Sequence, residues 1–347
     1  MRKVHVLAVS LFVSILLVRC VSPADIGGPF GQPHFPTPAE EARVHYTRGN
    51  NHYFSGESEE AIADYTKAIG VDATYAAAYL DRGSAYAMLG QWEEAVADFT
   101  HVVQIDPQYA GAHYKRAFAY TNLGRYEEAI ADWTEVIRIN PEFADAFYYR
   151  GVFHSRLGRH EAAIQDHTTA IGLEPDHAGA YFHRAYAYHQ LGEYDSALAD
   201  YASAVRINPT DAEAYNGRGS VRADLGQYEE AIADYTEAID IDQDYALAYY
   251  NRASAYYALA AYPLAAEDLT RSIAIKTDSA DAYFYRGFTH CLMAQYDEAI
   301  ADLESYLRLA QPDDEPRKTQ ADQCLQEIRH HLATPRETPP CQAAPTG

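Results

Sequence analysis

Histidine is concentrated near the middle of this chain, where His154, His160 and His167 follow one another closely among the 15 histidines of the sequence. Three imidazoles that converged between two helices would suit Zn²⁺, or would titrate at about pH 6 and respond to acid. The alternative is that each histidine replaces a tyrosine as a planar, partly buried side chain. Both interpretations stay open, so these three residues are candidate ligands only, and no metal or other cofactor is predicted.

The chain has four cysteines, Cys20, Cys291, Cys324 and Cys341, and no pair of them has the C-x-x-C spacing of a zinc site. Cys324 and Cys341 lie near the C-terminus, where they either form a disulfide or remain two thiols. The sequence also lacks a nucleophile elbow, a phosphate-binding loop and a dinucleotide fingerprint. We therefore expect a protein that is not an enzyme.

The charge of the chain is strongly acidic, with 50 Asp and Glu against 27 Lys and Arg and a formal net charge of -23. Nucleic acid is not an expected partner, because phosphate binding requires a basic surface. Tyrosine occurs 30 times and tryptophan only twice among the 347 residues. So strong a bias indicates that a few positions are used again and again.

A period of 34 residues runs through most of the chain. An Arg followed by Gly or Ala recurs at this interval from Arg48 to Arg286, and an Ala always stands six residues before it, from Ala42 to Ala280. Counted from that Ala, each of the eight units also has Ala at its twentieth position and Asp at its twenty-third. Self-similarity at such a period is typical of solenoid proteins.

Each unit contains two stretches with the apolar spacing of an α-helix. In the second unit these stretches are separated by Leu89-Gly90 and followed by Asp106-Pro107. Glycine favours the end of a helix because it tolerates the left-handed conformation, and proline cannot continue a helix. The repeating structure is therefore a helical hairpin. Ala260 and Ala294 replace the mid-unit glycine in the last two units, where we expect looser or slightly shifted turns.

In length and pattern these units resemble tetratricopeptide (TPR) repeats. The resemblance implies an all-α fold, a right-handed superhelix of eight helix-turn-helix repeats over residues 42–311. Residues 312–333 have an apolar face that predicts a C-terminal capping helix, which a solenoid needs to cover its last repeat. Residues 334–347 are rich in proline and are expected to be a disordered tail.

The Arg at position 7 and the Asp at position 23 occur in all eight units. We expect them to form a ladder of charge-assisted contacts that link each second helix to the first helix of its own or of the next unit. The alternative is that each side chain is an independent, solvated charge, in which case it contributes little.

The resemblance also implies where a partner binds, because TPR arrays bind other proteins on the concave face that their first helices line. Positions 5 and 9 of this face are rich in aromatic residues, which anchor peptide segments well. The alternative for some of these rings is packing between helices. A second hypothesis for the groove is binding of small molecules or glycans. The candidate groove residues are Tyr46, Tyr114, Phe118, Tyr148, Phe182, Tyr186, Tyr250, Phe284 and Phe288.

The N-terminus predicts export from the cytoplasm. Arg2 and Lys3 precede a short apolar segment, so residues 1–24 are expected to be a signal peptide. Three alternatives remain: cleavage after Ala24, lipidation of Cys20 in a segment that resembles a bacterial lipobox, or an uncleaved anchor. Any membrane contact would be through that anchor alone, followed by a linker rich in proline and glycine at 25–41. The expected location is periplasmic, anchored to the cell envelope or extracellular, and the expected role is a scaffold for other proteins.

Overall fold

The computed structural model describes residues 37–312, 314–334 and 340–341, and these ranges contain seventeen α-helices and no β-strand. The predicted signal peptide, Cys20 and most of the predicted linker lie outside the described residues. Within the described ranges, no helix combines the length and the apolar character that crossing a membrane requires.

Sixteen of the helices form eight consecutive hairpins, as the period predicted. The first helices of the hairpins are α1 (Pro38–Phe54), α3 (Ala76–Met88), α5 (Ala110–Asn122), α7 (Ala144–Arg156), α9 (Ala178–Gln190), α11 (Ala212–Asp224), α13 (Ala246–Ala258) and α15 (Ala280–Leu292). The second helices are α2 (Ser58–Val71), α4 (Trp92–Ile105), α6 (Tyr126–Ile139), α8 (His160–Leu173), α10 (Tyr194–Ile207), α12 (Tyr228–Ile241), α14 (Tyr262–Ile275) and α16 (Tyr296–Leu309).

The two helices of a hairpin approach closely because a small residue faces a large one. A Cβ atom added to Gly83 would lie only 2.7 Å from the ring of Phe99, and one added to Gly219 would lie 2.7 Å from the ring of Tyr235. The alanine at position 20 is fully buried in all eight units, from Ala61 to Ala299. This alternation of small and large side chains lets the two helices pack closely.

The turn inside each hairpin keeps one conformation throughout the array. Glycine occupies it in the first six repeats with φ between 71° and 80°, as at Gly56 and Gly124. Our expectation of looser or shifted turns in the last two repeats was wrong, because Ala260 and Ala294 adopt the same left-handed region at φ 56° and 58°. The packing of the two helices holds the turn in this conformation. Alanine adopts it although its Cβ atom makes the left-handed region unfavourable.

The predicted boundaries need correction at both ends. Helix α1 begins at Pro38, inside the segment predicted as linker, because Thr37 and Glu40 form a reciprocal capping box at its start. At the other end, α17 (Glu315–Ala333) is the predicted capping helix. Pro340 and Cys341 are buried, so these two residues of the predicted disordered tail are ordered against the fold.

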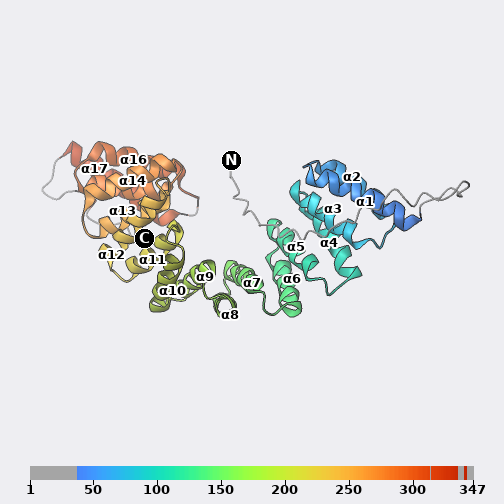
Figure 1. Ribbon diagram of the computed structural model, residues 1–347. Coiled ribbons are helices and arrows are strands. Elements are labelled where there is room, and N and C mark those ends of the chain that lie inside the picture. The colour runs from blue at the N-terminus through green and yellow to red at the C-terminus, as the bar shows by residue number, and fades with distance from the viewer. Residues whose placement is uncertain (1–36, 313, 335–339, 342–347) are drawn as a thin grey trace, which may run out of the picture.

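The hairpins follow one another in a curved array, with the first repeat at one end and α17 at the other (Figure 1). In the middle of the array, α7 and α9 lie on the inner side of the bend, and α8 and α10 lie on the outer side. Helix α17 packs its Ala321, Leu325 and Ile328 against the last repeat. Leu332, near the end of the same helix, is 51% exposed.

Candidate functional site

The Arg–Asp ladder is present in every repeat and lies within the hairpin. In each case the guanidinium of position 7 donates to the carboxylate of position 23 in the same unit, as Arg116 Nε and Nη2 do to Asp132 at 2.8 and 2.7 Å. The carboxylates are buried, and the arginine side chains of repeats two to eight are only 15–20% exposed. Bidentate charge-assisted hydrogen bonds of this kind fix the relative orientation of the two side chains and also stabilise the hairpin.

The same arginines also join neighbouring repeats. At six of the seven junctions the second terminal nitrogen donates to a threonine on the second helix of the preceding repeat, over 2.9–3.2 Å. These threonines are Thr66, Thr100, Thr134, Thr168, Thr236 and Thr270. Ala202 occupies the equivalent place between repeats five and six, where Arg222 joins Arg218 on Asp234 instead. The ladder therefore positions the first helices that line the inner side of the bend.

Side chains on successive first helices contact one another across the junctions. The residue at position 5 meets the residue at position 6 of the next repeat, as when the hydroxyl of Tyr46 donates to Asp81 over 2.7 Å. Asn251 donates to Asn216 at 2.9 Å, and the rings of Tyr250 and Tyr285 meet edge to face at 5.8 Å. Sequence analysis missed position 6, because its side chains belong to no apolar stripe and its partners lie a whole repeat away.

Two charged side chains at position 6, Asp81 and Lys115, have shifted pKa values. Burial raises the pKa of the Asp81 carboxyl, while the hydrogen bond from Tyr46 and the charge of Lys115 oppose that shift. Burial likewise lowers the pKa of the Lys115 ammonium, and the charge of Asp81 opposes it. Asp81 and Lys115 therefore form a complementary pair of half-buried charges at the N-terminal end of the inner face.

The fourth junction holds a cluster of imidazoles around Tyr148. The ring of His183 lies 5.6 Å from that of Tyr148 and 5.8 Å from that of His167, and the ring of His177 lies 4.7 Å from Tyr148. Burial lowers the pKa of His183 to about 4, and it holds the pKa of His167 well below its usual range. These two imidazoles are therefore neutral at pH 7 and resist protonation in the folded protein.

Comparison with protein families identifies the repeats. The family model described as TPR repeat matches residues 49–90, 83–124, 119–158, 185–226 and 219–260, which together cover more than half of the chain. The chain belongs to the tetratricopeptide repeat family. A second TPR model, described as Tetratricopeptide repeat, matches residues 144–177, and a model described as Anaphase-promoting complex subunit 5 matches residues 249–333. The chain matches none of the curated proteins with which it was compared.

Solved structures show the same TPR fold. A tetratricopeptide repeat protein from Parabacteroides merdae is 20% identical, with a TM-score of 0.56 over 72% of this chain and 98% of that one. The Cut9–Hcn1 hetero-tetramer of the APC/C matches with a TM-score of 0.56 at 18% identity, over 80% of this chain and 55% of that one. YrrB, described as a TPR protein with an unusual peptide-binding site, is 26% identical over 53% of this chain and 95% of its own, with a TM-score of 0.47.

Seven of the nine candidate aromatic residues of the predicted groove are at least partly exposed. Tyr186 is the most open of them at 41%, and Tyr46, Tyr114, Phe118, Tyr148, Phe182 and Tyr250 are half-buried. Phe284 and Phe288 are buried at 0% and 3% exposure, so their assignment to an accessible groove was wrong. The reason is α17, whose apolar side chains cover the last TPR repeat at the place where a following repeat would stack.

Two clefts adjoin the exposed aromatics. A cleft of about 190 Å³ lies beside Tyr114 and is lined by Gly111, Val136 and Phe143 among others. A cleft of about 140 Å³ lies beside Tyr250, with Leu247, Lys276 and Asp281 in its walls. Each is large enough for one or two side chains of a bound chain, and neither encloses a whole small molecule.

The three candidate histidines do not converge, because their side chains point to different places. His154 lies 4.0 Å from Asp166 of the ladder, the ring of His160 lies 6.4 Å from that of Tyr186, and His167 packs in the imidazole cluster. Positions 11, 17 and 24 of a TPR unit therefore face different neighbours. The described residues bring three potential ligands within 4.8 Å of one another at two other places, and neither place includes any of the three candidate histidines.

One of these two places is Asp145, Glu174 and His177. His177 Nδ1 accepts the backbone N–H of Ala180 over 3.1 Å at the start of α9, so the proton of the neutral ring is on Nε2. That Nε2 lies 3.5 Å from Asp145, and because it carries the proton it has no lone pair with which to ligate a metal ion. The group is thus a helix cap with acidic neighbours, and its chemistry does not suit a metal ion.

Proposed function

We propose that this TPR protein is a scaffold or adaptor that binds a peptide segment of a partner protein along the inner side of its bend. The observation that carries the proposal is the set of partly exposed aromatic side chains on the first helices α1, α5, α7, α9 and α13, which the packing of the hairpins leaves accessible. Rings held by a rigid framework lose little entropy on binding and are frequent hot spots of protein interfaces.

The charge around these aromatic side chains indicates the chemistry of the segment. Asp145, Asp224 and Asp281 are about half exposed on the first helices, at 49%, 51% and 53%, and the whole chain carries a net charge of -23. An acidic partner would be repelled at long range and a basic one attracted. The expected ligand is therefore an extended or helical segment that has apolar anchors and basic residues between them.

Selection from a library of random peptides tests this proposal directly. The purified protein should enrich peptides with apolar and basic residues, and Tyr186→Ala should weaken the selected peptides about tenfold, as expected for the loss of a ring at an interface. Leu264→Ala is the matched control, because Leu264 is 46% exposed but lies on the second helix of repeat seven. Failure to enrich any peptide, or equal loss in both variants, would contradict the proposal.

We also propose that the protein acts outside the cytoplasm. The support is the basic start and apolar segment of residues 1–24 in the sequence. Fusion of residues 1–41 to a reporter enzyme that is active only after export should give activity, and replacement of Leu16 and Leu17 by Arg should abolish it. Equal reporter activity with and without the two arginines would contradict export, and retention of export by Cys20→Ser would argue against lipidation as its requirement.

A further inference from the structure

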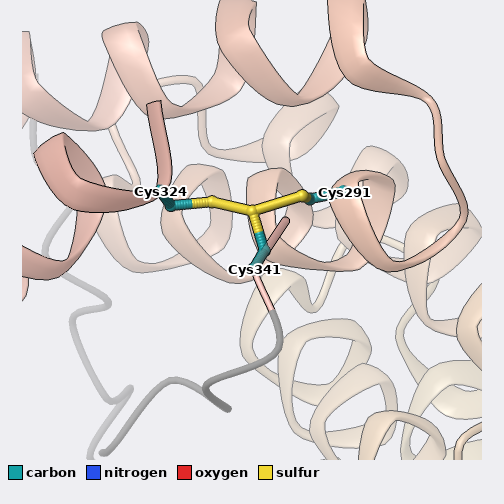
Figure 2. Close-up of side chains that lie close together, drawn as sticks. All are labelled: Cys291, Cys324 and Cys341. Atoms are coloured by element: carbon teal, nitrogen blue, oxygen red, sulfur yellow. A yellow bond between two sulfur atoms is a disulfide. The ribbon is translucent and has the colours of Figure 1, made fainter. Parts of the chain in front are cut away.

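Three cysteines from three separate segments meet at the C-terminal end of the array. Cys291 lies on α15, Cys324 lies on α17 and Cys341 belongs to the segment that follows α17. All three are 3% exposed. Figure 2 shows their sulfur atoms in a row, with Sγ of Cys341 between the other two. No other described segment contributes a cysteine to this group, and a pairing of Cys324 with Cys341, one of the two alternatives that the sequence left open, accounts for only two of the three.

Cys341 is placed to form a disulfide with either neighbour. Its Cα lies 5.4 Å from that of Cys324 and 6.3 Å from that of Cys291, and both separations lie in the range that a disulfide spans without movement of the backbone. A cystine sulfur carries a single S–S bond, so Cys341 can pair with only one of its two neighbours at a time. The two disulfides are therefore alternatives, and each leaves one buried thiol beside the bond.

We propose that Cys291, Cys324 and Cys341 form an internal thiol–disulfide exchange site, in which Cys341 changes partner between the last repeat and the cap. The thiolate of Cys291 attacks Sγ of Cys341, the bond from Cys341 to Cys324 breaks, and Cys324 leaves as a thiolate that takes up the proton lost by Cys291. One S–S bond forms and one breaks, so the step needs no oxidant or reductant. The reverse step has the same balance.

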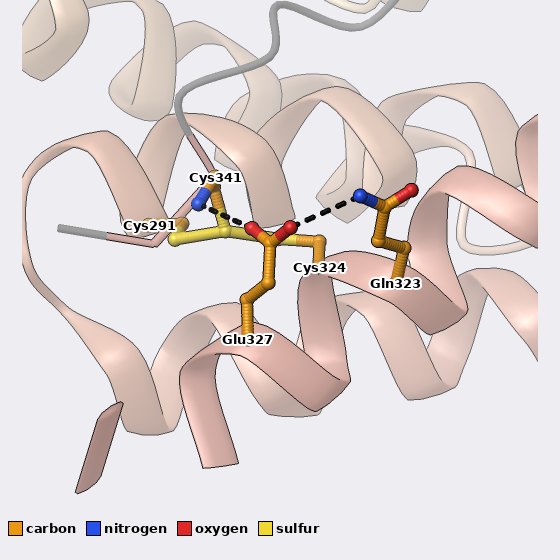
Figure 3. Close-up of a disulfide and its surroundings, with 5 residues drawn as sticks. All are labelled: Cys291, Gln323, Cys324, Glu327 and Cys341. Carbon is orange, nitrogen blue, oxygen red and sulfur yellow. Dashed lines mark hydrogen bonds between the residues drawn. A yellow bond between two sulfur atoms is a disulfide. The ribbon is translucent and has the colours of Figure 1, made fainter. Parts of the chain in front are cut away.

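The surroundings hold Cys341 in place while its partner changes. Glu327 on α17 accepts the backbone N–H of Cys341 over 3.0 Å with one carboxylate oxygen, and it accepts from Gln323 over 3.1 Å with the other (Figure 3). Glu327 is a positioning residue here, because it fixes the backbone of the central cysteine and does not take part in the exchange. A cavity of about 30 Å³, lined by Cys324, Phe288 and Gln320 among others, leaves room for the released Cys324 thiol to rotate.

The choice of partner decides whether the cap is covalently tied to the last repeat. The Cys324–Cys341 bond has a sequence separation of 17 and closes a loop within the cap alone. The Cys291–Cys341 bond has a separation of 50, so the loop that it closes contains α16 and α17 and is anchored on α15. Exchange therefore switches the end of the array between a free cap and a locked cap, with no change in the number of disulfides.

Mass spectrometry of the unsubstituted protein tests the proposal. The purified protein is quenched in acid, its thiol is alkylated, and it is digested with pepsin at low pH so that the bonds cannot rearrange during digestion. Both cross-linked peptides, 291–341 and 324–341, are expected in one sample, with the alkyl label divided between Cys324 and Cys291. A single pairing, a Cys291–Cys324 bond, or three thiols that hold a metal ion in the intact mass would each overturn the proposal.

Two variants each permit only one of the two disulfides, so that the effect of each disulfide on the cap can be measured. Cys324→Ser permits only the locking bond and Cys291→Ser permits only the bond within the cap, while each keeps one disulfide. Backbone amides of α16 and α17 should exchange hydrogen at least about tenfold more slowly in Cys324→Ser, because opening the cap then requires a longer cross-linked unit to unfold. Equal exchange in the two variants would overturn the switch between a locked and a free cap.

Discussion

The first and last repeats are built on the same pattern, yet they present different surfaces. The ladder arginine of the first repeat, Arg48, is 48% exposed, whereas Arg286 of the last repeat is 16% exposed. At position 5, Tyr46 is half-buried and bonds to Asp81, whereas Phe284 is fully buried. Among the described residues, no second helix precedes the first repeat to cover Arg48, and the last repeat has α17 over Phe284.

The difference shows that a repeat specifies its own hairpin but not its own surface. The small residues, the Arg–Asp contact of the ladder and the left-handed turn all act within one unit, so they recur in every repeat. Exposure depends on which element stacks next, and that element changes at the two ends. A binding residue predicted from its position in a repeat must therefore be checked against the neighbour of that repeat.

Removal of the cap's central side chain should make the last repeat behave like the first. Ile328→Ala should destabilise the C-terminal repeat by about 3 kcal/mol, because Ile328 is fully buried and its truncation leaves a cavity between α17 and the last repeat. Amide hydrogen exchange over α15 and α16 measures the effect. Leu332→Ala on the same helix is the control and should change little, because Leu332 is 51% exposed; equal losses would show that α17 does not cover the repeat.

Acid should open the middle of the array before either end. Burial lowers the pKa of His183 to about 4, so a fall from pH 7 to pH 5 protonates this histidine in the unfolded chain but not in the folded one. Stability is complete above about pH 6.5 and falls as pH drops toward 4, by about 2 kcal/mol between pH 7 and pH 5 for this one group. Hydrogen exchange of α7 to α9 at the two pH values measures the loss.

The ends should resist this change, because their ladder carboxylates titrate at lower pH. The hydrogen bond from Arg48 lowers the pKa of Asp64 to about 2, and contacts with His290 and Arg286 hold that of Asp302 below its usual value against the effect of burial. Their contribution is present above about pH 4 and is lost only as pH falls below it. His183→Asn, which copies Asn251 of repeat seven, should flatten the dependence between pH 7 and pH 5. An unchanged slope would place its origin elsewhere.

The sequence predicted what repeats within a unit. The recurrence of Arg and Asp at positions 7 and 23 predicted the ladder, because two opposite charges kept in every unit favour a contact that is repeated in every unit. The row at position 6 could not be predicted in this way, since its residues vary from Asp81 to Lys115 to His183 and no shared chemistry marks them. Their contacts follow from the stacking of one repeat on the next.

The burial of Phe284 and the separation of the three candidate histidines have the same physical origin. Phe284 satisfies the groove pattern, but the sequence alone does not show that α17 lies over it. His154, His160 and His167 are close in sequence, but a hairpin turns positions 11, 17 and 24 toward three different neighbours. Cys341 has a second partner, Cys291, because the fold brings α15 next to the segment that follows α17, at a sequence separation of 50.

The ladder should be more important at the covered end than at the open one. Arg286→Met should destabilise the last repeat by roughly 1.5 kcal/mol, because it leaves the buried carboxylate of Asp302 without its main partner. His290, whose Nδ1 lies 3.1 Å from Asp302, keeps the loss below that of an unpaired buried charge. Arg48→Met should have a smaller effect, since water replaces its contacts, and urea denaturation of both variants compares the two. Equal losses would show that exposure does not set the strength of the ladder.

The hairpin turns allow opposite substitutions at the two ends, and their expected effect on stability is the smallest of those considered. Gly56 and Ala294 both occupy the left-handed region, at φ 80° and 58°, and alanine there carries a steric cost that glycine avoids. Ala294→Gly should therefore stabilise the last repeat by about 0.5 to 1 kcal/mol, after the greater freedom of glycine in the unfolded chain is subtracted.

Gly56→Ala should destabilise the first repeat by a similar amount, and a Cβ atom there would meet nothing within 4 Å, so the change acts on the backbone alone. Urea denaturation of both variants measures the two changes in stability. Ala260→Gly in repeat seven should stabilise the protein as Ala294→Gly does. A loss on Ala294→Gly would mean that the alanine methyl makes a stabilising contact at the capped end. The stability of the turn would then depend on the element packed beside it, as the exposure of surface residues does. In that case the last repeat would not specify its own hairpin independently of its neighbour.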